Sequence, residues 1–418
     1  MHRWYPDGPF RRVLETAGKA SGSPPPGSKL RPRQRLRRGS REAMSRTRVM
    51  LFTGRLGGGG AEKNLLRVAN SLDRAEFAPE IIVARSGGSY ELQIRNDVPF
   101  RPLVRHLTRS STLSVFRSIP ALSMSARSSR PSILCSFMDL PNAAAMLTSP
   151  SAHTRRVLCV QNNPREAYRG TRLEPAVHFA IRHLYPRADA IIALSHGVAA
   201  ELLEMQPALE RVLTVVHNAA TGNGFDAETV VPAKASGRPL LLACGRLNEQ
   251  KDYPTMLRAF ARVLETHPAA RLRILGDGPL RSSLEALSRS LGLSRSIEFL
   301  GFQPDPFAHM KAADLFVLTS AYEGFGNVVA EALACGTPVV STDCDHGPRE
   351  ILADGEYGAL VPVGDVEATA NAITRLLDDP ERRRAFSERG KLRASQFTAE
   401  SVARAYADVF RLVLSHAA

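Results

Sequence analysis

The sequence has no apolar run long enough to cross a bilayer, since none of its hydrophobic stretches approaches the roughly 18 residues that a membrane span requires. Its N-terminal segment also lacks the apolar core of about 7–15 residues that marks a secretory signal. The cysteines show neither paired spacing nor a CxxC motif, and they are Cys135, Cys159, Cys244, Cys335 and Cys344. Five scattered cysteines favour reduced, buried thiols, so we expect a cytoplasmic protein.

Acidic residues are scarce at the front of the chain. Residues 1–48 carry 13 Lys/Arg against 3 Asp/Glu, residues 49–218 carry 20 against 13, and residues 219–418 carry 22 against 25. A basic face of this kind can meet nucleic acid, anionic lipid or a phosphate-bearing substrate. Aromatic residues make up only 6% of the chain and form no stacking pattern, and no nucleic-acid-binding module is recognisable. We therefore expect no nucleic-acid partner, although a basic nucleic-acid-binding protein remains the non-enzyme alternative.

Apolar runs alternate with helix-forming segments along most of the chain, which predicts an α/β protein with parallel sheets and crossover helices. Turn-forming residues interrupt this rhythm once, and the alternation then begins again. The prediction is two facing Rossmann-like domains with a cleft between them. The expected divisions are a disordered basic extension over 1–46, a first domain over 47–219, a linker over 220–237, a second domain over 238–397, and a helix over 398–418 that could pack back on the first domain.

Two glutamates, Glu323 and Glu331, stand eight positions apart where a predicted strand gives way to a glycine-rich loop and a helix. Ligands of doubly wound sheets lie beyond the carboxyl ends of strands, where backbone N–H groups at helix starts bind anionic or hydroxyl oxygen. Carboxylates accept hydrogen bonds from hydroxyl groups, so this pair suits a polyol ligand. A solvated helix with two surface acids is the alternative interpretation.

The motifs around this pair resemble those of the retaining glycosyltransferases of family 4, which have the GT-B fold. They are Tyr-Glu-Gly-Phe-Gly-Asn from residue 322, Cys-Gly-Thr-Pro-Val-Val-Ser-Thr-Asp-Cys from residue 335, and Gly-Pro-Arg-Glu-Ile-Leu from residue 347. The resemblance covers about residues 48–415. It implies that Glu331 holds the nucleotide ribose, that Glu323 contacts the donor sugar, and that the loop and helix start steady the sugar and phosphates through Gly324, Phe325, Gly326 and Asn327.

Arg246 and Lys251 follow another predicted strand, five positions apart. In the matching motif of the family, an arginine and a lysine grip the donor diphosphate, and fixed cations stabilise a leaving group that departs with added negative charge. A cationic pair removes the need for a metal, so we expect no metal and no cofactor beyond a nucleotide-sugar co-substrate, expected to be UDP-linked. The pair Asp343 and Asp345 resembles an Asp-x-Asp metal motif, but it lies within the family pattern and is not assigned to a metal.

A glycine-rich loop follows the first predicted strand. The resemblance implies that this loop closes on the donor phosphates, with Gly58 and Gly59 expected to approach them most closely. A dinucleotide fingerprint would need an acidic residue near the end of the second strand, where the sequence has Arg85 instead. A purely structural tight turn is the remaining alternative for the loop. Phe302 follows a strand of the second domain, in a neighbourhood that lines the base pocket in relatives, so the resemblance implies that it contacts the base, although a core aromatic fits the pattern equally well.

One position departs from the family pattern. Many relatives carry a histidine after the fifth strand of the first domain, and here Asn162 or Asn163 takes its place. An amide can hydrogen-bond a sugar hydroxyl but cannot take a proton at neutral pH. Asn162 is therefore a candidate catalytic residue without a general-base role. His196 and His217 follow later strands and are weaker candidates for the cleft.

Residues 101–130 contain six arginines and no acidic residue, interleaved with apolar side chains. This pattern predicts a basic amphipathic segment on an anionic membrane, with an ordinary solvated helix as the alternative. Family members with similar motifs often act on lipid-carried glycans, so the resemblance and this segment together imply transfer of a hexose or N-acetylhexosamine to a lipid-linked glycan, lipopolysaccharide or exopolysaccharide acceptor, at the inner face of the cytoplasmic membrane. A sugar-nucleotide 2-epimerase with the same architecture is the enzymatic alternative.

Overall fold

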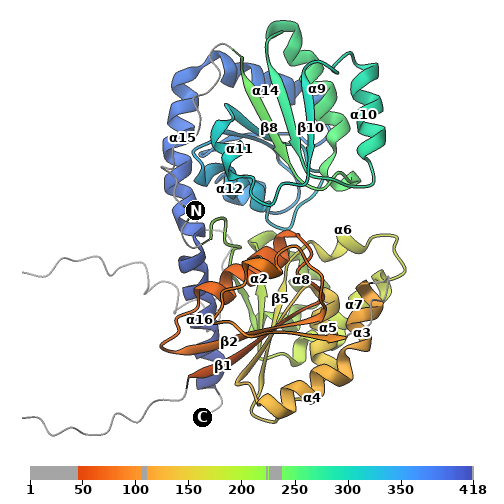
Figure 1. Cartoon of the computed structure of the whole chain (residues 1–418), viewed down its shortest axis with the longest axis vertical. Helices are drawn as coiled ribbons and strands as arrows, with labels where there is room; N and C mark the ends of the chain where they lie inside the picture. Colours follow the sequence, from red (N-terminus) through yellow and green to blue (C-terminus); the bar gives the residue numbers. More distant parts are fainter. Residues whose placement is uncertain (1–45, 105–110, 223–224, 226–237, 417–418) are drawn as a thin grey trace, which may run out of the picture.

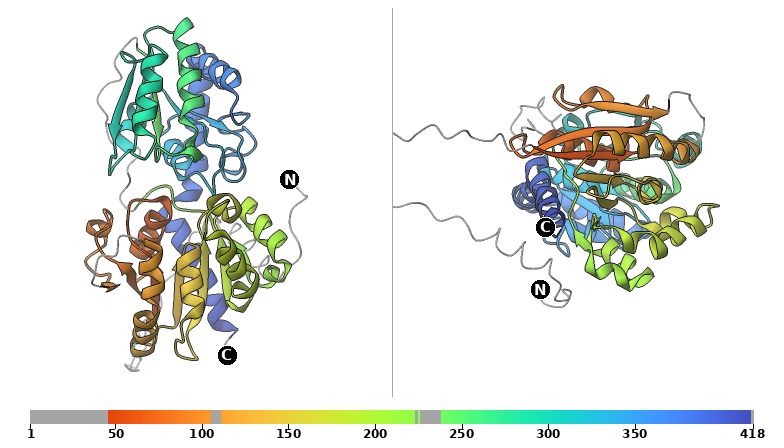
Figure 2. Two further views of the ribbon diagram at one scale, coloured as in Figure 1. Left: turned by 90° about the vertical axis from the view of Figure 1, so that its right-hand side faces the viewer. Right: turned by 90° about the horizontal axis from the view of Figure 1, so that it is seen from below.

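The computed structural model describes residues 46–104, 111–222, 225 and 238–416. Within them, two α/β domains are stacked along the long axis of the molecule (Figure 1). Each domain is built on one parallel sheet covered by helices, as two views at right angles show (Figure 2). The predicted fold class is confirmed. The predicted extension over 1–46 falls outside the described residues except for Arg46, as does most of the predicted linker.

The first domain has seven parallel strands in the order β3-β2-β1-β4-β5-β6-β7. Its strands are β1 Thr47–Thr53, β2 Phe77–Arg85, β3 Phe100–Val104, β4 Ile133–Phe137, β5 Arg155–Val160, β6 Ala190–Ala193 and β7 Leu213–Val215. Its helices are α2 Gly60–Ser71, α3 Ser111–Arg117, α4 Ile119–Ser129, α5 Asp139–Leu147, α6 Pro164–Tyr168, α7 Glu174–His183 and α8 His196–Met205. The central strands are continuous apolar runs because helices cover both faces of the sheet.

The second domain has six parallel strands in the order β10-β9-β8-β11-β12-β13. Its strands are β8 Leu240–Cys244, β9 Arg271–Leu275, β10 Ile297–Gly301, β11 Leu315–Leu318, β12 Val339–Thr342 and β13 Ala359–Val361. Its helices are α9 Tyr253–Thr266, α10 Arg281–Ser290, α11 Phe307–Ala312, α12 Asn327–Ala334, α13 Pro348–Ile351, α14 Val366–Asp378 and α15 Pro380–Ala394, and a last helix, α16 Ala399–Ser415, follows.

The strand order reverses between β1 and β4 in the first sheet and between β8 and β11 in the second. Connections on the two sides of such a point leave in opposite directions and open a crevice at the carboxyl ends of the strands, where ligands of this fold bind. The loops at these two points are therefore those after β1, β4, β8 and β11. Three of them carry residues predicted for the site, and the loop after β4 leads into Asp139, which the sequence analysis did not single out.

Strands β3 and β13 were not predicted, and both lie at sheet edges. Strand β3 contains Arg101 and Pro102, and β13 is three residues long, so neither carries the apolar run of a central strand. The segment over 101–130 is not one amphipathic helix. Strand β3 takes its first residues, and α3 and α4 are separated at Ser118. Two of its apolar side chains, Val115 and Leu122, are buried in the core.

Helices α15 and α16 run along one side of the molecule, and α16 lies beside the first domain (Figure 1). Its Tyr406 hydroxyl accepts a hydrogen bond from Asn64 of α2 at 3.3 Å, and Phe410 meets Phe77 edge to face at 6.0 Å between ring centroids. The C-terminal helix is therefore part of the hydrophobic core of the first domain. No helix within the described ranges combines the length and the apolar character needed to span a bilayer.

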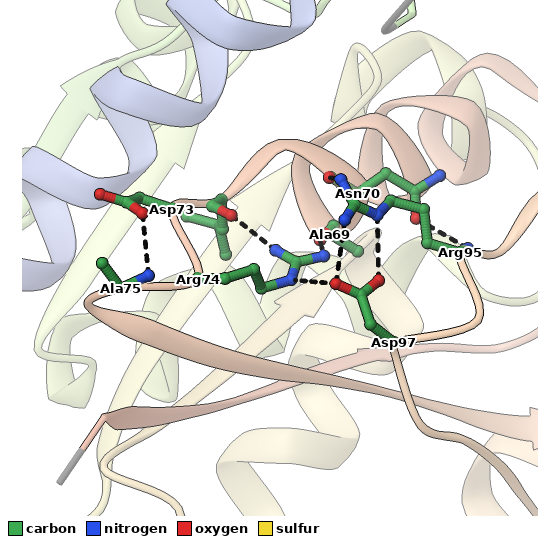
Figure 3. A network of polar contacts seen from close by, with 8 residues as sticks. Ala69, Asn70, Asp73, Arg74, Ala75, Arg95 and Asp97 are labelled. Atoms are coloured by element: carbon green, nitrogen blue, oxygen red, sulfur yellow. Dashed lines mark hydrogen bonds and ion pairs between the residues drawn. The ribbon is translucent and has the colours of Figure 1, made fainter.

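The turn after α2 is held by a polar network on the surface (Figure 3). Arg74 contacts Asp97 at 3.1 Å and donates to the carbonyl of Ala69 at 2.9 Å, and Arg95 contacts the same carboxylate at 2.9 Å. These exposed pairs contribute little energy individually. They fix the C-terminal end of α2, whose first turn lies at the domain interface.

Replacement of Phe410 by alanine tests the packing of α16. The ring is fully buried, so the substitution leaves a cavity, and we expect a loss of about 3 kcal/mol in the free energy of unfolding. Urea denaturation followed by circular dichroism measures this loss. Leu392→Ala, at a side chain that is 72% exposed on α15, is the control and should change stability by less than about 0.5 kcal/mol. Equal effects of the two substitutions would contradict this packing.

Candidate active site

The glycine-rich loop after β1 lies directly against the second domain. A Cβ atom at Gly58, where φ is +107°, would lie 3.7 Å from the ring of Phe302, and one at Gly60 would collide with the amide of Asn327. Asn327 begins α12 and accepts a hydrogen bond from Asn218 of the first domain at 3.2 Å. The absence of side chains in the loop therefore lets α2 begin within contact distance of the start of α12. Gly59, next to these residues, faces its own helix, with a Cβ position that would collide with Glu62.

Glu331 lies in α12 and is paired with two cations from α2 of the first domain. Lys63 Nζ is 2.7 Å from Glu331 Oε1, and Arg67 Nη2 is 3.2 Å from the same oxygen. The side chains of Glu331 and Arg67 are 3% and 7% exposed. Helix α2 brings both cations to one carboxylate because residues four apart lie on the same helix face. The candidate ribose-binding carboxylate is therefore held by the opposite domain.

Glu323 lies in the loop after β11 and is paired with Lys251, which ends the 3₁₀ turn Glu249–Lys251. The Ser320 hydroxyl donates to the same Glu323 oxygen at 2.8 Å. The backbone N–H of Glu323 also donates to the carbonyl of Asp345 at 3.1 Å, which fixes the loop. Two residues from different motifs of the sequence, Glu323 and Lys251, are thus in direct contact.

Arg246 is exposed on the loop after β8 and faces the first domain. Its charge lowers the pKa of Glu62 in α2, although burial has the larger effect and raises that pKa overall. Phe302 is 48% exposed and is not a core residue, so it is free to contact a ligand. Arg246 and Phe302 of the second domain therefore both lie near the glycine loop and the first turn of α2.

The two asparagines after β5 have different roles. The Asn163 side chain accepts a hydrogen bond from the backbone N–H of Glu166 at 3.1 Å and caps α6. Asn162 lies against the donor-side loop, where a Cβ atom at Gly324 would be only 3.0 Å from Asn162 Cα. The Oδ1 atom of Asn162 is buried and has no hydrogen-bond partner among the described residues. Asn162, and not Asn163, is therefore the residue that keeps an unsatisfied acceptor next to the donor-side loop.

Phe325 is buried and does not line the cleft with its side chain. Its ring stacks on His217 at 5.2 Å, and His217 hydrogen-bonds Glu350 of α13. Glu350 also accepts the backbone N–H of His196, at the start of α8, at 3.0 Å. Burial raises the pKa of Glu350, but the hydrogen bond from His217 and the charges of both histidines outweigh it and hold this pKa below its usual range.

This group of His196, His217 and Glu350 has ligand atoms within 4.8 Å of one another, as a metal site would. Two of them already make contacts between the domains: Glu350 accepts the backbone N–H of His196 at the start of α8, and His217 stacks on Phe325 of the second domain. We therefore assign the group to the domain interface. The absence of a metal requirement stays a prediction.

Sequence reasoning missed Lys63, Arg67, Asp139 and Glu350. Lys63 and Arg67 belong to the helix that follows the glycine loop. Their four-residue spacing places two cations on one face of this helix, which could have marked them as candidates. Glu350 was quoted within a motif without a role. Asp139 had no motif around it. Its position is significant only once the strand order places β4 at the switch point.

The comparisons with known proteins agree with this geometry. Residues 58–220 match the family Glycosyltransferase Family 4, and residues 225–393 match Glycosyl transferases group 1. The lipopolysaccharide core biosynthesis glycosyltransferase LpsE of Rhizobium meliloti is 30% identical over 355 residues, which cover 83% of this chain and 94% of LpsE. N-acetylgalactosamine-N,N'-diacetylbacillosaminyl-diphospho-undecaprenol 4-alpha-N-acetylgalactosaminyltransferase of Campylobacter jejuni is 28% identical over 365 residues, which cover 85% and 96%.

Among solved structures, the Anabaena protein HepE in complex with UDP and glucose superposes with a TM-score of 0.74 at 19% identity, over 87% of this chain and 99% of HepE. Two facing parallel-sheet domains with loops from both switch points at their interface are the architecture of the GT-B fold. The chain belongs to glycosyltransferase family 4.

Replacement of Arg67 by methionine tests the interdomain pair. Arg67→Met removes one of the two cations that neutralise the buried Glu331 carboxylate and also the hydrogen bond from Arg67 to the carbonyl of Ala219, and we expect a loss of about 3 kcal/mol in the free energy of unfolding. Arg411→Met, which breaks an exposed pair with Glu76, should cost less than about 1 kcal/mol. Urea denaturation of both variants makes the comparison. A loss from Arg67→Met no larger than that of the control would show that Glu331 does not depend on the cation.

Proposed function

We propose that this glycosyltransferase transfers a hexose or N-acetylhexosamine from a UDP-linked donor, with retention of anomeric configuration, to a lipid-linked glycan, lipopolysaccharide or exopolysaccharide acceptor. The observation that carries the donor assignment is the meeting of two acid–cation pairs at one cleft. Glu331 is paired with Lys63 and Arg67, and Glu323 is paired with Lys251. Carboxylates suit ribose and sugar hydroxyls, and cations suit a diphosphate.

In this proposal Glu331 accepts hydrogen bonds from the ribose hydroxyls, and Glu323 orients the donor sugar. Both cations of the first domain contact Oε1 of Glu331, so Oε2 is the oxygen we assign to ribose. Arg246 and Lys251 stabilise the charge that develops on the departing diphosphate, which makes a metal unnecessary. Lys251 must then leave Glu323 in part and turn to phosphate as the donor enters.

The acceptor's proton has no histidine to receive it at the position of Asn162. We therefore assign the proton to the leaving phosphate, in a front-face mechanism that retains configuration. The C–O bond of the donor breaks toward the diphosphate, and the acceptor oxygen bonds to the same face of the anomeric carbon. The proton of the acceptor hydroxyl goes to the phosphate oxygen that departs, so charge and atoms balance without a protein base.

The acceptor class rests on the names of relatives. LpsE is named for lipopolysaccharide core biosynthesis, and the Campylobacter enzyme is named for an undecaprenol-diphosphate-linked acceptor. A lipid-linked acceptor would require this chain to meet a membrane surface. Helices α3 and α4 support such a contact, because Leu113, Phe116 and Met124 are exposed there together with Arg117 and Arg127.

Replacement of Glu323 by glutamine tests the donor assignment. We expect the wild-type protein to gain thermal stability with one or a few members of a panel of nucleotide sugars. Glu323→Gln should lower kcat by roughly 100-fold, because it weakens an interaction with the reacting sugar, and change nucleotide affinity by less than about threefold. Glu388→Gln, at an exposed position on α15, is the matched control.

Product analysis by NMR distinguishes the proposal from its alternative. The proposed enzyme releases nucleoside diphosphate and leaves a glycoside with the anomeric configuration of the donor, in the presence of EDTA. A 2-epimerase would instead change the configuration at C2 of the sugar. If no nucleotide sugar stabilises the protein, or if Glu323→Gln loses affinity and turnover equally, the donor assignment fails.

The membrane contact is tested with vesicles of 30% anionic phospholipid at low salt. The wild-type protein should cosediment with them, and binding should decrease as salt increases. A variant with Phe116→Ser and Met124→Ser should bind at least about fivefold more weakly, because it loses the exposed apolar contacts. Leu392→Ser, which removes an exposed apolar side chain from the second domain, should bind as the wild type does. Equal binding of all three proteins would show that the exposed apolar side chains of α3 and α4 do not make the membrane contact.

A further inference from the structure

Asp139 lies at the carboxyl end of β4, at the switch point of the first sheet, and begins α5. The residue before it, Met138, has φ +79° and ψ 156°. This region of backbone conformation is almost restricted to glycine, and strained residues of this kind concentrate at functional sites. The strained turn places a carboxylate beside the loop after β5, which is where Asn162 lies.

The Asp139 side chain is buried without full hydrogen bonding. It is 1% exposed, and its Oδ1 atom accepts a hydrogen bond from the Tyr185 hydroxyl at 3.3 Å. Its Oδ2 atom has no partner of adequate geometry within the described part of the chain. A buried polar atom left in this way calls for an explanation, since most such atoms in folded proteins are satisfied.

The side chains that face Asp139 come from three neighbouring segments. They are Asn162 from the loop after β5, Tyr168 from α6, and Tyr185 from the 3₁₀ turn Tyr185–Arg187. Burial raises the pKa of Asp139 to about 6, and the polar groups of these three side chains and its own backbone N–H have a smaller, lowering effect. No cation is among the main influences on this carboxyl group.

A carboxylate can only accept hydrogen bonds, whereas an asparagine amide has a donating and an accepting end. An ionised Asp139 therefore attracts the NH₂ group of Asn162 and repels its Oδ1 atom. In agreement, Oδ1 of Asn162 is buried without a partner, beneath the donor-side loop at Gly324. The amide therefore has one end directed by the first domain, and its other end lies beneath the donor-side loop, at the contact between the domains.

We propose that Asp139 is a positioning residue, which holds the amide of Asn162 so that Oδ1 accepts a hydrogen bond from a hydroxyl group of the bound sugar substrate. The inference rests on the proposed function, since it assumes a sugar at this cleft. It assigns no proton transfer to Asp139. The carboxylate acts through Asn162, and the orientation of that amide depends on whether Asp139 is ionised.

The pH profile of kcat/KM tests the inference. Turnover is measured as nucleoside diphosphate released from the nucleotide sugar that stabilises the protein most, with water and with octyl glycosides as acceptors. The wild type should lose activity below about pH 6, because a protonated Asp139 can donate to Oδ1 of Asn162 and compete with the substrate. Asp139→Asn should be at least tenfold less active, with no loss of activity centred near pH 6.

Tyr185→Phe provides a variant that leaves both Asp139 and Asn162 in place. The Tyr185 hydroxyl lowers the pKa of Asp139, so its removal should move the acid side of the profile to higher pH. A structural role for Asp139 alone would not produce this shift. An unchanged profile in both Tyr185→Phe and Asp139→Asn would overturn the inference.

The double variant Asp139→Asn/Asn162→Ala separates positioning from direct contact. If Asp139 acts only through Asn162, the double variant should be no less active than Asn162→Ala alone. A further loss of tenfold or more would show that Asp139 contacts the substrate itself, and the inference would be wrong. Donor binding, measured by thermal shift, should persist in all variants. If even the wild type binds no nucleotide sugar, it is the proposed function that fails.

The thermal stability of Asp139→Asn shows whether this variant still folds. The pKa of Asp139 is higher in the folded chain, at about 6, than its ordinary value of 3.8. Its ionisation therefore destabilises the fold increasingly as pH rises from about 4 through 6, and the full effect is present at pH 7.5. Asp139→Asn should consequently melt at a higher temperature than the wild type at pH 7.5, by several degrees. A lower melting temperature would contradict the burial of an unsatisfied carboxylate on which the inference depends.

Discussion

Glu331 is a carboxylate buried at the junction of the two domains, and the arrangement of the cleft depends on its neutralisation by Lys63 and Arg67. Taking such a group out of water costs several kcal/mol unless charge and hydrogen bonds replace the lost solvation. The second domain supplies the acid and the first domain supplies both cations. The candidate ribose site and the contact between the domains therefore share one carboxylate, and any ligand of Glu331 must enter an interaction that already joins the domains.

The topology explains why so many polar residues meet at this junction. Each sheet reverses its strand order once, and the loops beside the two reversals face each other. The glycine loop approaches Asn327, and Gly324 approaches Asn162, so each domain offers backbone without side chains where the other comes closest. Asp139 lies at this junction for the same reason, because it comes just after β4, which is next to the strand-order reversal of the first sheet. The positive φ of Met138 and the unpartnered Oδ2 atom of Asp139 both lie at this point.

The sequence predicted the fold class and the principal motifs because these are local patterns. The loop and helix around Glu323 and Glu331, and the strand before Arg246, lie where the alternation of apolar runs placed them. The contacts between motifs were not predictable, since the pairing of Lys63 with Glu331 joins residues 268 positions apart. Strand β3 was missed because Pro102 and Arg101 interrupt its apolar pattern. Asp139 was missed because its burial and lack of partners are properties of the folded chain and leave no mark on the sequence around it.

The central claim is that the cleft binds a nucleotide sugar between Glu331 and the Arg246–Lys251 pair. A crystal structure of the chain grown with UDP tests it most directly. The account predicts ribose hydroxyls within hydrogen-bond distance of Glu331, the diphosphate in contact with Arg246 and Lys251, and Lys251 displaced from Glu323. UDP bound elsewhere, or bound in the cleft with Glu331 still contacting only Lys63 and Arg67, would contradict it.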